Sequence, residues 1–186
     1  MYRISELIKL DRKLYHTQDL AILWKISNKN TLYTTVKRYV KKGILVQVYK
    51  GLYSTIPLPQ LNPLELGKAI IHDYAYLTNE SVLTQFGIIN QISDGFTFAA
   101  KKSRRINVGG FSFFYRKLKD YYLLNPAGIA DQNGILTASL ERAVADMLYF
   151  SPKYHFDLPE NIDWKKVEQI QKIFFRVVLD KHKDPP

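Results

Sequence analysis

The apolar residues repeat most regularly between residues 28 and 43. Four of them follow one another at helical spacing, so they predict a helix with one buried face. These are Leu32, Val36, Tyr39 and Val40. Asn28 is suited to cap the first turn, and Gly43 to end the helix in the left-handed conformation that glycine adopts without strain. The opposite face is polar and cationic, and it carries Asn30, Thr34, Lys37, Arg38 and Lys41.

The residues on either side of this helix predict a winged helix-turn-helix. After it, Ile44–Tyr49 and Leu52–Thr55 are expected to form two strands joined by a tight turn at Lys50-Gly51. Before it, two shorter apolar patterns predict helices, the second of them capped by Thr17. His16, next to that cap, is interpreted as a surface or capping histidine rather than a phosphate contact. Three helices followed by a basic hairpin is the element order of a winged helix-turn-helix.

Three prolines interrupt the pattern after the hairpin. They are Pro57, Pro59 and Pro63. Because proline lacks an amide donor and biases the preceding residue toward extended conformations, residues 57–63 are expected to form a linker. The predicted domains are therefore residues 1–56, the winged helix-turn-helix, and residues 64–186.

The C-terminal part mixes strand patterns with helix patterns. Aromatic and β-branched residues alternate roughly in residues 96–100 and 107–116, and a further strand is expected at 135–138. Helices are expected to begin after the capping residues Thr78, Ser139 and Asp163. The predicted fold class is α+β, with an N-terminal winged helix-turn-helix followed by a mixed α/β C-terminal domain.

The net charge of +10 is concentrated in the first third of the chain. Residues 1–56 contain 11 Lys or Arg against 3 Asp or Glu, whereas residues 57–186 contain 16 against 14. Phosphate neutralisation depends on the number of charges, so this distribution predicts a polyanionic partner for the N-terminal segment. Cysteine is absent, which excludes disulfides and thiolate metal sites. Because no apolar run approaches the length of a membrane span and no signal-peptide pattern occurs, we expect a cytoplasmic protein without a membrane partner.

The sequence lacks the motifs of common enzyme active sites. No two of the four histidines have the HxxxH spacing, and no phosphate-binding loop, nucleophile elbow or nucleotidyltransferase pattern occurs. Glu141, Arg142 and Asp146 form a compact charged group, but they lack a nucleophile and a metal partner. Arg142 and Asp146 are four residues apart on a predicted helix and are interpreted as a structural ion pair. We expect no enzymatic activity, no cofactor and no bound metal.

A second basic group follows the strand predicted at residues 96–100. Residues 95–119 contain no acidic residue. Two interpretations remain open: a solvated loop, and a second surface for a polyanion or an acidic partner protein. The group consists of Lys101, Lys102, Arg104 and Arg105, with Arg116, Lys117 and Lys119 further along.

Several segments together resemble one protein family. They are the N-terminal helix-turn-helix, the strand-turn-strand from Gly43 to Tyr53, residues 75–83 with Gly87-Ile88, and residues 137–148. The more specific parts are the G-L-Y of the hairpin (51–53) and the E-R-A-x-x-D of the helix (141–146). In this order they resemble the AbiEi family of antitoxins and transcriptional regulators, from the type IV toxin–antitoxin systems of bacterial abortive infection. Val82 departs from the family pattern, which has a small residue there.

The resemblance implies a repressor that binds DNA through its N-terminal domain and autoregulates its operon. It also implies a C-terminal domain that neutralises a nucleotidyltransferase-like toxin and self-associates. Since a single winged domain contacts only a few base pairs, a homodimer on inverted or direct repeats of its own promoter is expected. A stand-alone regulator that had lost the toxin would have the same sequence features.

The polar front of the helix, with Thr34, Lys37, Arg38 and Lys41, is expected to face the major groove of double-stranded DNA. The N-terminal end of the helix (29–31) and Lys50 of the hairpin are expected to meet phosphates or the minor groove. Asn30 and Thr34 are the expected base contacts, and the lysines position the helix. The predicted DNA-binding residues are Lys29, Asn30, Thr31, Thr34, Lys37, Arg38, Lys41 and Lys50.

Three alternatives to DNA binding remain open. The first is a solvated amphipathic helix with an ordinary hairpin. The second is a protein-interaction module whose basic N-terminus docks an acidic toxin or enzyme, without specific DNA binding. The third is an enzyme acting on nucleic acid, for which the sequence lacks the carboxylate cluster that would bind a divalent metal.

Overall fold

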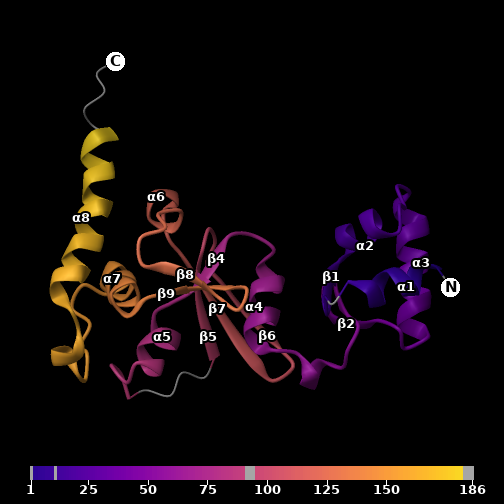
Figure 1. The fold of residues 1–186 in the computed structure, drawn as a ribbon, viewed down its shortest axis with the longest axis horizontal. Coiled ribbons are helices and arrows are strands. Elements are labelled where there is room, and N and C mark those ends of the chain that lie inside the picture. Colours follow the sequence, from indigo (N-terminus) through magenta and orange to yellow (C-terminus); the bar gives the residue numbers. More distant parts are fainter. Residues whose placement is uncertain (1, 11, 91–94, 182–186) are drawn as a thin grey trace. The chain divides into compact units, whose positions relative to one another are not determined.

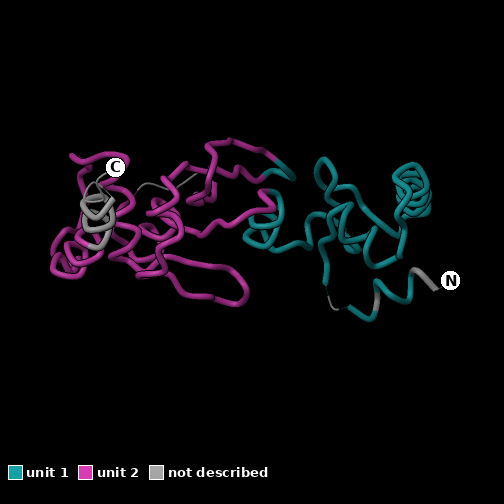
Figure 2. Tube along the Cα trace, turned by 90° about the horizontal axis from the view of Figure 1, so that it is seen from above, with its two compact units in different colours: residues 1–70, 108–110 teal, residues 71–107, 111–186 magenta. Residues whose placement is uncertain are grey.

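The computed structural model describes residues 2–10, 12–90 and 95–181, which fold into two compact units (Figure 2). Unit 1 consists of Met1–Ile70 and Val108–Gly110, and unit 2 of Ile71–Asn107 and Phe111–Pro186. The division falls after Ile70, so residues 57–63, which the sequence predicts as a linker, are counted with unit 1. Within them Leu61 is buried, with 4% of its surface exposed.

Unit 1 combines helices with a three-stranded antiparallel sheet whose strand order is β1-β3-β2. Its elements are α1 (Tyr2–Lys9), β1 (Leu14–His16), α2 (Thr17–Leu23), α3 (Lys29–Lys41), β2 (Val46–Tyr49), β3 (Leu52–Ser54), a 3₁₀ turn (Leu58–Gln60) and α4 (Pro63–Ile71). The Asn28 side chain accepts a hydrogen bond from the amide of Thr31 at 3.1 Å, and Gly43 has a positive φ of 69°. Both ends of α3 are therefore set by the residues that the sequence suggests.

The entry into α2 differs from the sequence prediction. His16, not Thr17, is the N-cap, and its amide donates to Asp19 Oδ2 at 2.9 Å. Thr17 instead donates both its amide (3.0 Å) and its hydroxyl (3.2 Å) to the carbonyl of Gly51. The His16 ring is half-buried, with Nε2 2.7 Å from the carbonyl oxygen of Ala69. These contacts place His16 in the framework of unit 1, at the end of the unpredicted strand β1.

The core of unit 1 is built around the inner face of α3. Leu32, Val36 and Tyr39 are at most 7% exposed, and the ring of Tyr39 meets Trp24 edge-to-face at a centroid distance of 5.1 Å. The core residues from other elements include Leu7, Tyr15, Leu20, Leu45 and Tyr53. Burial of large apolar side chains on one face of α3 leaves its polar face to solvent.

Unit 2 is organised around a six-stranded mixed sheet with strand order β6-β7-β5-β4-β9-β8. β4 runs parallel to β9, β5 runs parallel to β7, and the β4–β5 and β8–β9 pairs are antiparallel. Its elements are β4 (Ala75–Leu77), α5 (Glu80–Gln85), β5 (Gly95–Ala100), β6 (Arg104–Val108), β7 (Phe111–Lys117), α6 (Asp120–Leu123), β8 (Ile129–Gln132), β9 (Ile135–Ala138), α7 (Leu140–Phe150), a 3₁₀ turn (Pro159–Asn161) and α8 (Trp164–Lys181). α5 and α7 pack together, and α8 packs against α7 (Figure 1). The α+β class predicted from the sequence is confirmed.

Two local predictions for unit 2 are wrong. The strand expected at residues 107–116 is two strands, because Gly109 and Gly110 both have positive φ and turn the chain between β6 and β7. Arg104 and Arg105 consequently lie in β6 rather than in a loop. Thr78 does not cap α5: the N-cap is Asn79, and the Thr78 hydroxyl donates to Asp146 Oδ2 at 2.8 Å.

The buried guanidinium of Arg142 connects the elements of unit 2. Arg142 is fully buried, and its Nε donates to Asp146 Oδ1 at 3.0 Å, so the ion pair predicted from the sequence is formed. Its other nitrogens donate to the Tyr76 hydroxyl (2.7 Å) and to the carbonyls of Tyr122 (2.7 Å), Asn125 (3.0 Å) and Ala127 (2.9 Å). One side chain of α7 thereby fixes β4 and the segment from α6 toward β8.

Replacing Arg142 by Met should lower the free energy of unfolding by about 3–5 kcal/mol, because it leaves the Asp146 carboxylate buried without its cation. Chemical denaturation followed by circular dichroism measures this. The double variant Arg142→Met/Asp146→Leu should lose less free energy of unfolding than the sum of the two single variants, because it also removes the buried, unpaired carboxylate of Asp146. Exposed Arg104→Met is the control and should change stability little. Additive losses in the double variant would show that the pair is not coupled.

Candidate nucleic-acid interface

The exposed face of α3 carries the predicted DNA-binding residues in a narrow stripe. Asn30, Thr34, Lys37 and Lys41 are spaced by four, three and four residues, so they lie along one line of the helix surface. All four are exposed, and the buried residues of the helix lie opposite. Arg38 flanks this line on one side. We call these five residues the α3 stripe.

The N-terminal end of α3 is also exposed, but one of its predicted residues is already engaged. Lys29 is exposed. The Thr31 hydroxyl lies 3.4 Å from Asn28 Oδ1, which also accepts the Thr31 amide. Thr31 therefore stabilises the cap of the helix, and its hydroxyl proton is directed at Asn28 rather than at solvent.

The hairpin turn at Lys50 is anchored to the start of α2. Gly51 has a φ of 73°, and its carbonyl accepts the two hydrogen bonds from Thr17 described above. The β2–β3 register shifts between Gln47 and Tyr49 just before the turn. Lys50 is exposed on this anchored turn. The hairpin and α3 thus present cations from the same small unit.

Unit 1 has many more basic than acidic residues, and two of its carboxylates already pair with cations. Unit 1 contains 12 Lys or Arg against 4 Asp or Glu, and unit 2 contains 15 against 13. Glu6 lies 4.0 Å from Lys9, and Asp19 lies 2.5 Å from Arg12. Among the carboxylates whose side chains the structure describes, none pairs with a cation of the α3 stripe. Unpaired, exposed cations of one sign raise the local concentration of a polyanion.

Tyr33, which was not predicted as a site residue, flanks the α3 stripe on the side opposite Arg38. Its side chain is 51% exposed. It lies four residues after Lys29 and four before Lys37, but also three before Val36, at the border between the polar and apolar faces. Helical spacing alone therefore does not show that it is exposed. A tyrosine here offers both a stacking ring and a hydroxyl to a ligand.

The residues of the second basic group do not form one surface, because Arg104 and Arg105 are neighbours in β6 but have different surroundings. Lys101, Lys102 and Arg104 border one small hollow of unit 2. Arg105 is not part of it: its guanidinium lies over the ring of Phe114 at 5.0 Å.

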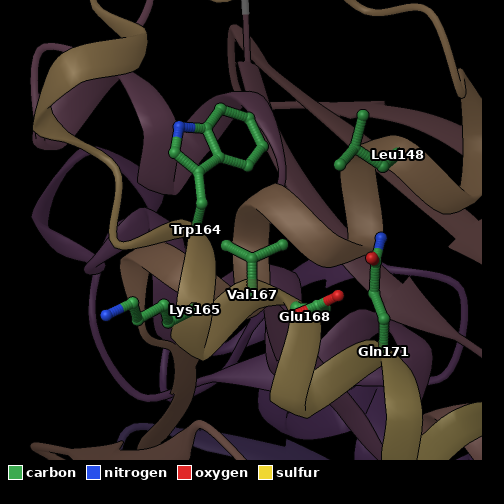
Figure 3. A pocket seen from close by; sticks show the side chains of 6 residues that line it. All are labelled: Leu148, Trp164, Lys165, Val167, Glu168 and Gln171. Carbon is green, nitrogen blue, oxygen red and sulfur yellow. The ribbon is translucent and has the colours of Figure 1, made fainter.

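A shallow groove in unit 2 runs between α7 and α8. It is lined by Leu148, Trp164, Lys165, Val167, Glu168 and Gln171 (Figure 3). Trp164 is 45% exposed but fixed, since its Nε1 donates to the Pro159 carbonyl at 3.0 Å and its ring meets Phe156 edge-to-face. Lys165 lies on the side away from Leu148 and Gln171 (Figure 3). The lining offers apolar contact and no converging set of acid, base and nucleophile.

Within the described ranges, no group of three or more His, Asp or Glu side chains is placed to hold a metal ion. Of the four histidines, His182 lies outside the described residues. None of the helices in the described ranges has the length and apolarity needed to cross a bilayer.

No protein-family model and no curated protein matches this sequence. Among solved structures, the chain is similar to the crystal structure of the RV2827C protein from Mycobacterium tuberculosis. The match has a TM-score of 0.56 at 14% sequence identity, and it covers 91% of this chain and 69% of that chain. At this identity the match establishes a shared fold.

Lys37→Ala should weaken binding of the full chain to duplex DNA of every sequence by a similar factor. It should also flatten the dependence of log K on log salt by about one unit, because one phosphate contact is lost. Fluorescence anisotropy with a labelled duplex across a salt series measures both. Exposed Lys153→Ala in unit 2 is the control with the same charge change. An altered sequence preference with an unchanged salt slope would contradict a phosphate role for Lys37.

Proposed function

We propose that unit 1 is a winged helix-turn-helix domain that binds double-stranded DNA, and that the chain is a transcriptional repressor. The observation that carries the proposal is the α3 stripe, a line of exposed cations and hydrogen-bonding side chains without carboxylate partners in the described structure. The order of helices, followed by the antiparallel β2–β3 hairpin, supports it. A helix of 13 residues with one polar face has suitable dimensions for a major groove.

In this mechanism α3 lies in the major groove. Asn30 donates to and accepts from a base edge, the pairing that an amide makes with adenine, and Thr34 contacts the neighbouring base. Lys37, Arg38 and Lys41 hold phosphates and set the register of the helix. Lys29 at the positive end of the helix dipole meets a further phosphate.

The hairpin supplies a second contact to the same duplex. Lys50 reaches a phosphate or the minor groove from its anchored turn. Because Thr17 fixes Gly51, little conformational entropy is lost when the turn meets DNA. One such domain contacts few base pairs, so two copies bind inverted or direct repeats at the protein's own promoter.

The resemblance to the AbiEi family extends the proposal to a type IV toxin–antitoxin system. Unit 2 then neutralises a nucleotidyltransferase-like toxin and contributes to dimer formation, while unit 1 represses the operon. Of the segments that carry the resemblance, residues 137–148 include Arg142 and Asp146, which stabilise the interior of unit 2.

Asn30→Ala tests the base-contact role on the full chain. Selection of binding sites from a randomised duplex pool should show relaxed preference at one base pair, worth about 1–3 kcal/mol, while the salt slope stays unchanged. Lys37→Ala is the matched variant: it should flatten the salt slope and leave the base preference unchanged.

A parallel titration with poly-glutamate separates DNA binding from docking of an acidic protein. At equal salt, the wild-type chain should prefer duplex DNA. If poly-glutamate binds as tightly and the selection yields no consensus sequence, unit 1 is a protein-docking module and the repressor proposal is wrong.

A further inference from the structure

The sheet of unit 2 brings two separate segments together at the ends of its central strands β4 and β5. Ala75 of β4 pairs with Ala100 of β5, so the residues just before β4 lie beside the turn that follows β5. Across this junction the Lys101 ammonium lies 3.0 Å from Asp73 Oδ1. A small hollow opens here, with a volume of about 90 Å³ and a lining of Ile71, Asp73, Lys101, Lys102 and Arg104.

The backbone on both sides of the hollow is held in place. Asp73 Oδ1 also accepts the amide of Tyr74 at 2.7 Å. On the other side, the Ser103 hydroxyl accepts the amide of Lys117 at 3.1 Å, which ties the turn to the end of β7. The cations are therefore carried on a fixed turn rather than on a mobile loop.

The charges around the hollow do not cancel. Asp73 neutralises Lys101, and hydrogen bonding from Lys101 holds the pKa of the Asp73 carboxyl below its usual value, with Lys102 contributing in the same direction. In the described ranges neither Lys102 nor Arg104 pairs with a carboxylate. The hollow thus has two uncompensated cations and one cation covered by an internal anion.

We propose that this hollow binds a backbone phosphate of nucleic acid, and that Asp73 competes with the phosphate for Lys101. Its size admits one small anionic group. An arginine with flanking lysines suits a phosphate, since guanidinium donates along two parallel directions and ammonium acts as a point charge. The site lies in unit 2 and goes beyond the DNA contacts proposed for α3.

Asp73→Asn in the full chain tests the competition, because it frees Lys101. Affinity for a labelled duplex should rise about five-fold at 0.15 M salt, and the salt slope should steepen by about one unit. Exposed Glu160→Gln in the same unit removes the same charge away from the hollow and should change neither. Equal effects of the two variants would overturn the proposal, since the gain would then reflect net charge alone.

The double variant Lys102→Ala/Arg104→Ala should weaken duplex binding about 25-fold at 0.15 M salt and flatten the slope by about two units. Lys153→Ala/Lys165→Ala, which replaces two exposed lysines of unit 2, is the control.

If the hollow variant binds the duplex as the wild type does while Lys37→Ala weakens binding, the hollow proposal fails and the α3 proposal stands. If only the hollow variant weakens binding, the α3 proposal fails instead. A loss of poly-glutamate binding as large as the loss of duplex binding would identify an acidic protein as the occupant and overturn the phosphate assignment.

Discussion

The contact between Trp24 and Tyr39 determines which face of α3 meets solvent. Trp24 ends α2, Tyr39 lies on α3, and their rings meet edge-to-face in the core of unit 1. Leu32 and Val36 lie on the buried side of α3 with Tyr39, so the residues on the opposite side must face solvent. The cationic surface of α3 is therefore a consequence of the apolar packing, and the proposed major-groove contacts depend on it.

Unit 2 is stabilised by a different kind of interaction. A buried guanidinium can be accommodated only if its donors find partners, and Arg142 finds a carboxylate, a hydroxyl and three carbonyls. Its partner Asp146 in turn accepts the hydroxyls of Tyr76 and Thr78. The network joins the central strand β4, α7 and residues 122–127, and so holds these parts of unit 2 together.

Local signals in the sequence predicted some of this well, and non-local contacts explain the rest. The ends of α3 follow from Asn28 and Gly43, and the Arg142–Asp146 pair follows from i, i+4 spacing. Strand β1 was missed because its three residues become a strand only by pairing with β3, about forty residues later. Thr78 looked like a helix cap, but its hydroxyl is taken by Asp146, far along the chain. The backbone carbonyls that Arg142 binds have no sequence signal at all.

The most direct test of the central claim is an amide NMR titration of the full chain with a duplex taken from the binding-site selection. The account predicts that the largest chemical-shift changes in unit 1 fall on the exposed positions of α3 and on residues 50 and 51, while buried Leu32 and Val36 change little. Changes that avoid α3 altogether, or no changes at saturating duplex, would contradict it.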